Sequence, residues 1–210
     1  MEFPYKRLSM SKEEILNRFQ NLQKYQPEYI NSKYRIHHMI KLIPFELFYL
    51  PEANFKLLVC KESDYNDYNN ISDYFIEEYR ILAKRYDAKQ NILEFWNDHI
   101  KEIKEHALKK YGDESAYSLR ESIYELAGME VGSFRVTNLI AIAKLFQSKA
   151  MLDFSSGWGD RLIGAMSQNI NYLGVDPNKN LHPCYQKIID FFQPFSSSKV
   201  KTICSGFEDL

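Results

Sequence analysis

The chain has 210 residues, of which 45% are hydrophobic and 26% charged, and its formal net charge is −1. This composition excludes collagen-like, low-complexity and wholly disordered proteins, and it provides no excess of positive charge to attract nucleic acid. No apolar run approaches the roughly 20 residues of a membrane-spanning helix, and the first residues lack the apolar stretch of a secretory signal. We therefore expect a soluble, cytoplasmic protein that does not contact membranes. The three cysteines have no metal-ligand spacing, so no metal site is expected.

Residues 1–132 are predicted to form a mostly helical region. None of the eight glycines lies before Gly112, and apolar residues recur every three or four positions over long stretches. The predicted elements, in chain order, are a helix opened by a capping box at Ser11–Glu14, an amphipathic stretch from Pro27 to Pro44, a strand at Phe55–Cys60, a helix face from Ile71 to Tyr86, another from Leu93 to Tyr111, and a helix capped by Ser118 and stopped by Gly128.

Residues 133–210 alternate between helical and strand patterns. The predicted elements are a helix from about Phe134 to Gln147, a strand at Ala150–Phe154, a helix from Asp160, a strand at Tyr172–Asp176, a helix at Leu181–Phe192 and a strand at Lys199–Cys204. This alternation predicts parallel pairing with right-handed crossovers. We therefore expect an α/β fold, the first half of a Rossmann-like doubly wound parallel sheet, preceded by the mostly helical N-terminal region.

A glycine-containing turn follows the first strand of this predicted sheet. Ligands of such sheets bind beyond the carboxyl ends of the strands, where Gly157 and Gly159 leave the backbone accessible. Asp176 ends the second strand, 19 residues after Gly157, and a carboxylate at about this spacing accepts hydrogen bonds from a ribose. The pattern predicts an adenosine-containing cofactor. Asp153 and Asp160 flank the turn, and two carboxylates would oppose a pyrophosphate.

The choice between a dinucleotide and a cofactor without phosphate depends on this turn. A dinucleotide usually requires G-x-G-x-x-G, and Leu162 stands at the third glycine position. S-adenosylmethionine carries no phosphate, and its ammonium and sulfonium groups are cationic, so nearby carboxylates favour it. Two other interpretations remain open at this point: Asp160 and Arg161 can be a helix cap and a solvated charge, and Trp158 can fill the core.

Two segments resemble class I S-adenosylmethionine-dependent methyltransferases. They are LDFSSGWGDRLIGA at Leu152–Ala165 and YLGVDPN at Tyr172–Asn178. The Gly-Trp-Gly-Asp-Arg-Leu form is similar to a subgroup of phage, large-virus and bacterial enzymes related to DNA-modifying methyltransferases. This resemblance implies a methyl transfer reaction, S-adenosylmethionine as cofactor and a nucleic acid as a plausible acceptor.

The resemblance also implies roles for individual residues. Asp153 and Gly157 would lie near the methionine part of the cofactor, and Asp176 would hold the ribose. The Ser205–Asp209 segment resembles the loop that contacts adenine, and the segment containing Phe134 resembles one that packs beside the methionine end. The implied cofactor-binding set is Asp153, Ser155, Gly157, Trp158, Gly159, Asp160, Asp176, Phe134 and Glu208.

The sequence departs from this family after the third predicted strand. In the relatives, a motif after the fourth strand contacts the acceptor, and no Pro-Pro pair of that motif occurs here. We therefore expect a cofactor-binding half that is truncated before the acceptor-binding motif, and we assign no catalytic residue. The alternative is a non-catalytic remnant or an assembly subunit of a split methyltransferase. It would act through a companion polypeptide or self-associate through an exposed sheet edge. A dinucleotide oxidoreductase is a third, disfavoured interpretation.

Overall fold

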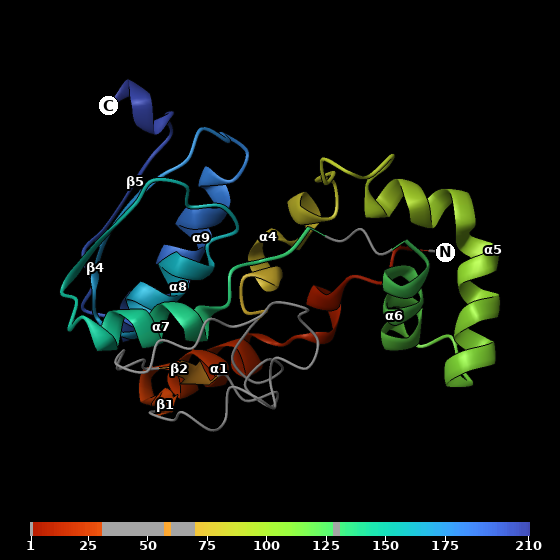
Figure 1. The fold of residues 1–210 in the computed structure, drawn as a ribbon, viewed down its shortest axis with the longest axis horizontal. Coiled ribbons are helices and arrows are strands. Elements are labelled where there is room, and N and C mark those ends of the chain that lie inside the picture. Colours follow the sequence, from red (N-terminus) through yellow and green to blue (C-terminus); the bar gives the residue numbers. More distant parts are fainter. Residues whose placement is uncertain (1, 31–56, 60–69, 128–130) are drawn as a thin grey trace, which may run out of the picture.

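The computed structural model describes residues 2–30, 57–59, 70–127 and 131–210 (Figure 1). Its C-terminal part is α/β, as the sequence predicts. Three parallel strands pair in the order β3-β4-β5. The strands are β3 (Ala150–Asp153), β4 (Asn171–Val175) and β5 (Val200–Ile203), and the crossover helices are α8 (Asp160–Ser167) and α9 (His182–Phe192). Each begins within one residue of its predicted position.

The two faces of this sheet have different surroundings. Met151, Tyr172 and Val200 occupy adjacent positions on neighbouring strands and pack against the main core. Figure 1 shows α8 and α9 on this side of the sheet. Leu152, one residue further along β3, points to the opposite face and is 52% exposed, because successive side chains of a strand alternate between the faces.

The main core joins the sheet to helices from both ends of the chain. It combines buried residues of α1 (Lys12–Lys24), α7 (Val136–Leu145), α8 and α9. Phe19 of α1 stacks on Phe192 of α9 with 4.1 Å between ring centroids. At Gly164, an added Cβ would lie 2.6 Å from Leu139 Cδ2, so this glycine permits the close packing of α8 against α7. The predicted division of the chain at residue 132 stays a prediction.

A second core lies between α5 (Ile92–Tyr111) and α6 (Ala116–Ala127). Asn91 begins α5 with a capping box, and Gly112 ends it in the left-handed conformation at φ +85°. Trp96 is almost fully buried here, with Phe3 from the N-terminus packed edge-on against its ring. In Figure 1 these helices lie at the opposite end of the molecule from the sheet.

Helix α4 (Asp73–Arg80) lies between the two cores and carries several buried charges. Arg80 pairs with Asp73 at 2.5 Å. Glu77 accepts hydrogen bonds from the backbone nitrogens of Lys6 and Arg7, in the short helix η1 (Lys6–Ser9). Burial raises the pKa of the Glu77 carboxyl, against the lowering effect of these hydrogen bonds.

The structure corrects the predicted helix from Ile71 to Tyr86. Helix α4 ends at Arg80, and Tyr86 is 99% exposed. Ile76 belongs to the main core and Ile81 to the second core. The helix therefore ends between Ile76 and Ile81, because one continuous apolar helix face cannot pack against both cores.

Two further predictions differ from the structure. Ser118 does not cap α6: the helix begins at Ala116, Ser115 Oγ accepts from the Ser118 nitrogen, and the Ser118 hydroxyl donates to Asp113. After Pro27, the sequence predicts a helical stretch, but the structure has the strand β1 (Glu28–Ile30). This strand pairs antiparallel with β2 (Leu57–Val59), which lies within the predicted strand at Phe55–Cys60. The remainder of that stretch and the helix stop at Gly128 lie outside the described residues.

Candidate functional site

The turn after β3 is joined directly to the end of β4. The Ser156 nitrogen donates to the Val175 carbonyl at 3.0 Å, and the Gly157 nitrogen donates to Asp176 Oδ2 at 2.8 Å. The structure therefore brings together the predicted glycine turn and the predicted ribose-binding carboxylate. Tyr185 of α9 donates its hydroxyl to the Gly157 carbonyl and holds the turn from the other side.

The Asp176 carboxylate is nearly buried but not fully used. Its Oδ2 accepts from Gly157 and its Oδ1 accepts from the Asn178 nitrogen at 2.9 Å. A carboxylate offers about four acceptor positions, so each oxygen can accept one more hydrogen bond. The side chain is 8% exposed, which leaves part of it accessible at the carboxyl end of β4.

Gly157 and Gly159 are glycines for different reasons. Both have left-handed backbone conformations, at φ +56° and +78°. A Cβ at Gly157 would make ordinary van der Waals contacts, 3.6 Å from the Ser155 carbonyl oxygen and 3.9 Å from Arg161 Nη2, so it would not clash with the chain. A Cβ at Gly159 would lie 2.9 Å from Ile188 Cδ1 of α9. Gly159 therefore serves the packing of α8 against α9, and Gly157 is needed only for its left-handed backbone conformation.

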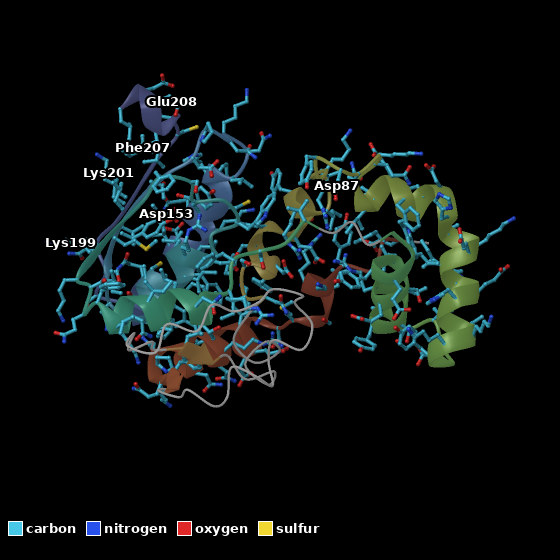
Figure 2. The ribbon with its side chains drawn as sticks, viewed as in Figure 1. Asp87, Asp153, Lys199, Lys201, Phe207 and Glu208 are labelled. Atoms are coloured by element: carbon cyan, nitrogen blue, oxygen red, sulfur yellow. The ribbon has the colours of Figure 1, made fainter. Side chains whose placement is uncertain are left out.

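The Asp153 carboxylate is occupied by partners within the chain. Its Oδ2 accepts from Arg161 Nε at 2.8 Å and from the Tyr172 hydroxyl at 2.7 Å, and its Oδ1 accepts from the Ser155 nitrogen at 3.3 Å. Burial, and then the charge of Asp153, raise the pKa of Tyr172, so the hydroxyl stays protonated and donates. The ring of Tyr172 lies over Gly174, where an added Cβ would be 2.5 Å away. Figure 2 shows Asp153 on the helix side of the sheet.

Arg161 is a residue of this site that the sequence-based set omits, as it omits Tyr172 and Tyr185. Besides its ion pair with Asp153, its Nη2 donates to the Ser155 carbonyl, and its guanidinium lies 5.2 Å from the centre of the Phe134 ring. Phe134, predicted from a distant segment, is thereby placed beside the turn. No hydrogen bond of Nη1 is found among the described residues. The pairing of Arg161 with Asp153 could have been suspected from two opposite charges at either end of one short turn.

Asp160 points away from the turn, toward α4. It accepts a hydrogen bond from the Ser72 hydroxyl at 2.6 Å. Burial, and to a smaller extent the negative charge of Asp73, raise the pKa of the Asp160 carboxyl, to about 7 overall. The Ser72 hydrogen bond and the positive charges of Arg80 and Arg161 lower it. Asp160 therefore belongs to the contact between α8 and α4.

The remaining predicted residues occupy separate places. Trp158 is half-buried and packs against the main core, which is the core-filling interpretation. Ser155 is exposed and contributes its backbone to Asp153 and Arg161. Glu208 is exposed in η3 (Phe207–Asp209), beyond the end of β5, and Figure 2 places it at the rim of the sheet.

The positions of Asp153 and Asp160 weaken the prediction that carboxylates at this turn exclude a pyrophosphate. Asp153 is neutralised by Arg161, and Asp160 faces Ser72. The two carboxylates therefore oppose a pyrophosphate less than their number in the sequence suggests. Leu162, at the third glycine position, is buried in the main core.

Neither a family model, a curated protein nor a solved structure matches this chain. Across the part of the chain that the structure describes, no three His, Cys, Asp or Glu side chains are grouped so as to hold a metal ion. None of the helices it describes is long and apolar enough to cross a membrane.

Proposed function

We propose that this chain binds S-adenosylmethionine at the turn between β3 and α8, as part of a Rossmann-like methyltransferase that modifies a nucleic acid. The observation that supports this most is the 2.8 Å hydrogen bond from Gly157 to Asp176. It joins the glycine turn of the first strand to the acidic end of the second, where ligands of parallel α/β sheets bind.

The residues around this turn fit the chemical groups of the cofactor. Asp176 retains acceptor positions for the two hydroxyls of a ribose, and Gly157 has no side chain to keep a ligand from its backbone. Arg161 is a cation held in place by Asp153, suited to the carboxylate of the methionine part. Glu208, at the end of β5, is the candidate for the adenine contact.

The chemistry of this proposal divides between cofactor and protein. S-adenosylmethionine supplies an electrophilic methyl group on a sulfonium. The residues of the turn bind and orient the donor, and such positioning accounts for much of the acceleration when two reactants are held together. We assign no residue of the described chain to the acceptor.

Calorimetric titration of the purified chain with S-adenosylmethionine, and separately with NAD, tests this function. We expect binding of S-adenosylmethionine alone. Asp176→Ala should weaken it by about 1–3 kcal/mol, roughly 5- to 150-fold, because hydrogen bonds to a charged group are lost. Asp176→Asn retains one acceptor oxygen and should weaken binding less.

The matched control is Asp190→Ala, which removes an exposed aspartate of α9 whose bonding partner among the described residues is Gln186. It should leave the affinity unchanged. Circular dichroism and thermal melting of each variant establish that the fold is intact. Tighter binding of NAD than of S-adenosylmethionine, or equal affinities of folded Asp176→Ala and wild type, would refute the proposal.

A further inference from the structure

The sheet has one face that the described helices leave uncovered. Leu152, Leu173 and Lys201 lie side by side across the three strands and point away from α8 and α9. Leu152 is 52% exposed and Phe154, two residues further along, is 64% exposed. We call this surface the open face. Parallel sheets occur almost only with both faces covered, so the open face is an unusual surface for a chain to present to water.

The apolar part of the open face extends to the residues after β5. The ring of Phe207 lies 5.8 Å from that of Phe154, and Phe207 is 47% exposed. This contact places η3 at the carboxyl end of the open face. Exposed apolar surface of this kind marks a site of association.

Charges of opposite sign lie at the two ends of β5. Lys199 and Lys201 stand at its start on the open face, and Glu208 and Asp209 follow its end. All four side chains are exposed, and within the described chain none of them forms an ion pair. Figure 2 shows Lys199, Lys201 and Phe207 on the side of the sheet away from the helices. The open face is therefore apolar across β3 and β4, with basic side chains along β5 and acidic side chains beyond the carboxyl end of β5.

We propose that the open face binds the open face of a second copy of this chain. The two-fold axis would lie between the two sheets, parallel to them and perpendicular to their strands. It would stack β5 of one copy on β5 of the other, with the two strands running in opposite directions. Lys199 and Lys201 of each copy would then meet Glu208 and Asp209 of the other. The apolar side chains on β3 and β4 of the two copies would cover each other. A two-fold interface requires such self-complementarity. Three strands make a small interface, so the dimer is weak and forms as concentration rises. This proposal does not rest on cofactor binding, although Glu208, the candidate adenine contact, is also assigned to the interface.

Sedimentation of the chain over a range of concentrations tests the apolar part of this interface. Wild type should show a monomer–dimer equilibrium, and Leu152→Glu should raise the dissociation constant at least tenfold. The matched control is Leu82→Glu, because Leu82 is 53% exposed and lies outside the sheet. It should dimerise like wild type. Dimers of Leu152→Glu as strong as wild type would show pairing through strand edges instead, and would overturn the proposal.

Charge exchange tests the predicted orientation. One variant carries Lys199→Glu and Lys201→Glu, and another carries Glu208→Lys and Asp209→Lys. Each alone should be monomeric, because like charges would meet at both ends of the interface. Their mixture should form a heterodimer at least as stable as the wild-type dimer, since both sets of pairs are restored, and added salt should weaken it. A mixture that stays monomeric, or a wild type that stays monomeric at every concentration, would overturn the proposal.

Discussion

At the level of single residues, the two glycines of the turn differ in how closely the chain packs around them. A Cβ at Gly157 would meet no atom closer than 3.6 Å, whereas a Cβ at Gly159 would lie 2.9 Å from Ile188 Cδ1. Gly157→Ala should cost roughly 1–2 kcal/mol of unfolding free energy from its positive φ. Gly159→Ala should cost roughly 2–4 kcal/mol, because crowding adds to the same strain. Urea denaturation of the two variants compares them, and equal losses would contradict this assignment.

Asp160 should make the stability of the protein depend on pH. Its pKa is about 7 in the folded state and near 4 when unfolded. The folded state therefore binds more protons between these values, and stability falls as pH rises through this window and levels off above it. Asp160→Asn keeps an acceptor for Ser72 but removes the buried charge.

The measurement is the unfolding free energy of wild type and Asp160→Asn in urea at pH 5, 6.5 and 8. Relative to wild type, the variant should gain stability with each increase in pH, by at most a few kcal/mol in total. Asp190→Asn, at an exposed site on α9, is the control and should show no such trend. If the unfolding free energies of wild type and Asp160→Asn changed in parallel with pH, ionisation of Asp160 would not destabilise the folded state, and this prediction would be wrong.

At the level of secondary-structure elements, α1 should behave as part of the sheet's own folding unit. Phe19 is fully buried and stacks on Phe192. Phe19→Ala should cost roughly 3–5 kcal/mol and should speed hydrogen exchange of the β4 amides. Leu8→Ala, at a residue 61% exposed, should change neither quantity. Unchanged exchange in β4 of Phe19→Ala would place α1 outside this unit.

The strands and helices around the sheet could be predicted from the sequence, and the partners of the charged side chains could not. An apolar run such as Ala150–Phe154 indicates a strand wherever the rest of the chain lies, but the burial it predicts is wrong for Leu152 and Phe154, which are exposed. The bond from Ser72 to Asp160 joins residues 88 positions apart. Only the tertiary packing of α4 against α8 decides that Asp160 turns inward. The Tyr172 hydroxyl reaches Asp153 for a similarly non-local reason, because Gly174 leaves room for the ring.

For the whole molecule, α4 connects the helical core of α5 and α6 to the core beneath the sheet. Its buried ion pair between Asp73 and Arg80, and the contact of Arg120 with Glu77, lie between the two cores. Breaking a buried pair is costly because it leaves an uncompensated charge. The two cores are therefore held in one arrangement by polar contacts, and the turn after β3 lies beside α4, since Asp160 accepts a hydrogen bond from Ser72.

The most direct test of the central claim is the amide signal of Gly157 in the presence of S-adenosylmethionine. The chain has eight glycines, so selective ¹⁵N-glycine labelling gives a simple spectrum, and the signal that Gly157→Ala removes identifies Gly157. We predict that S-adenosylmethionine shifts the Gly157 signal progressively to saturation, while that of Gly112, at the end of α5, stays unchanged. NAD should leave both signals in place. A Gly157 signal that does not respond to S-adenosylmethionine, or that responds equally to NAD, would contradict the proposed cofactor site.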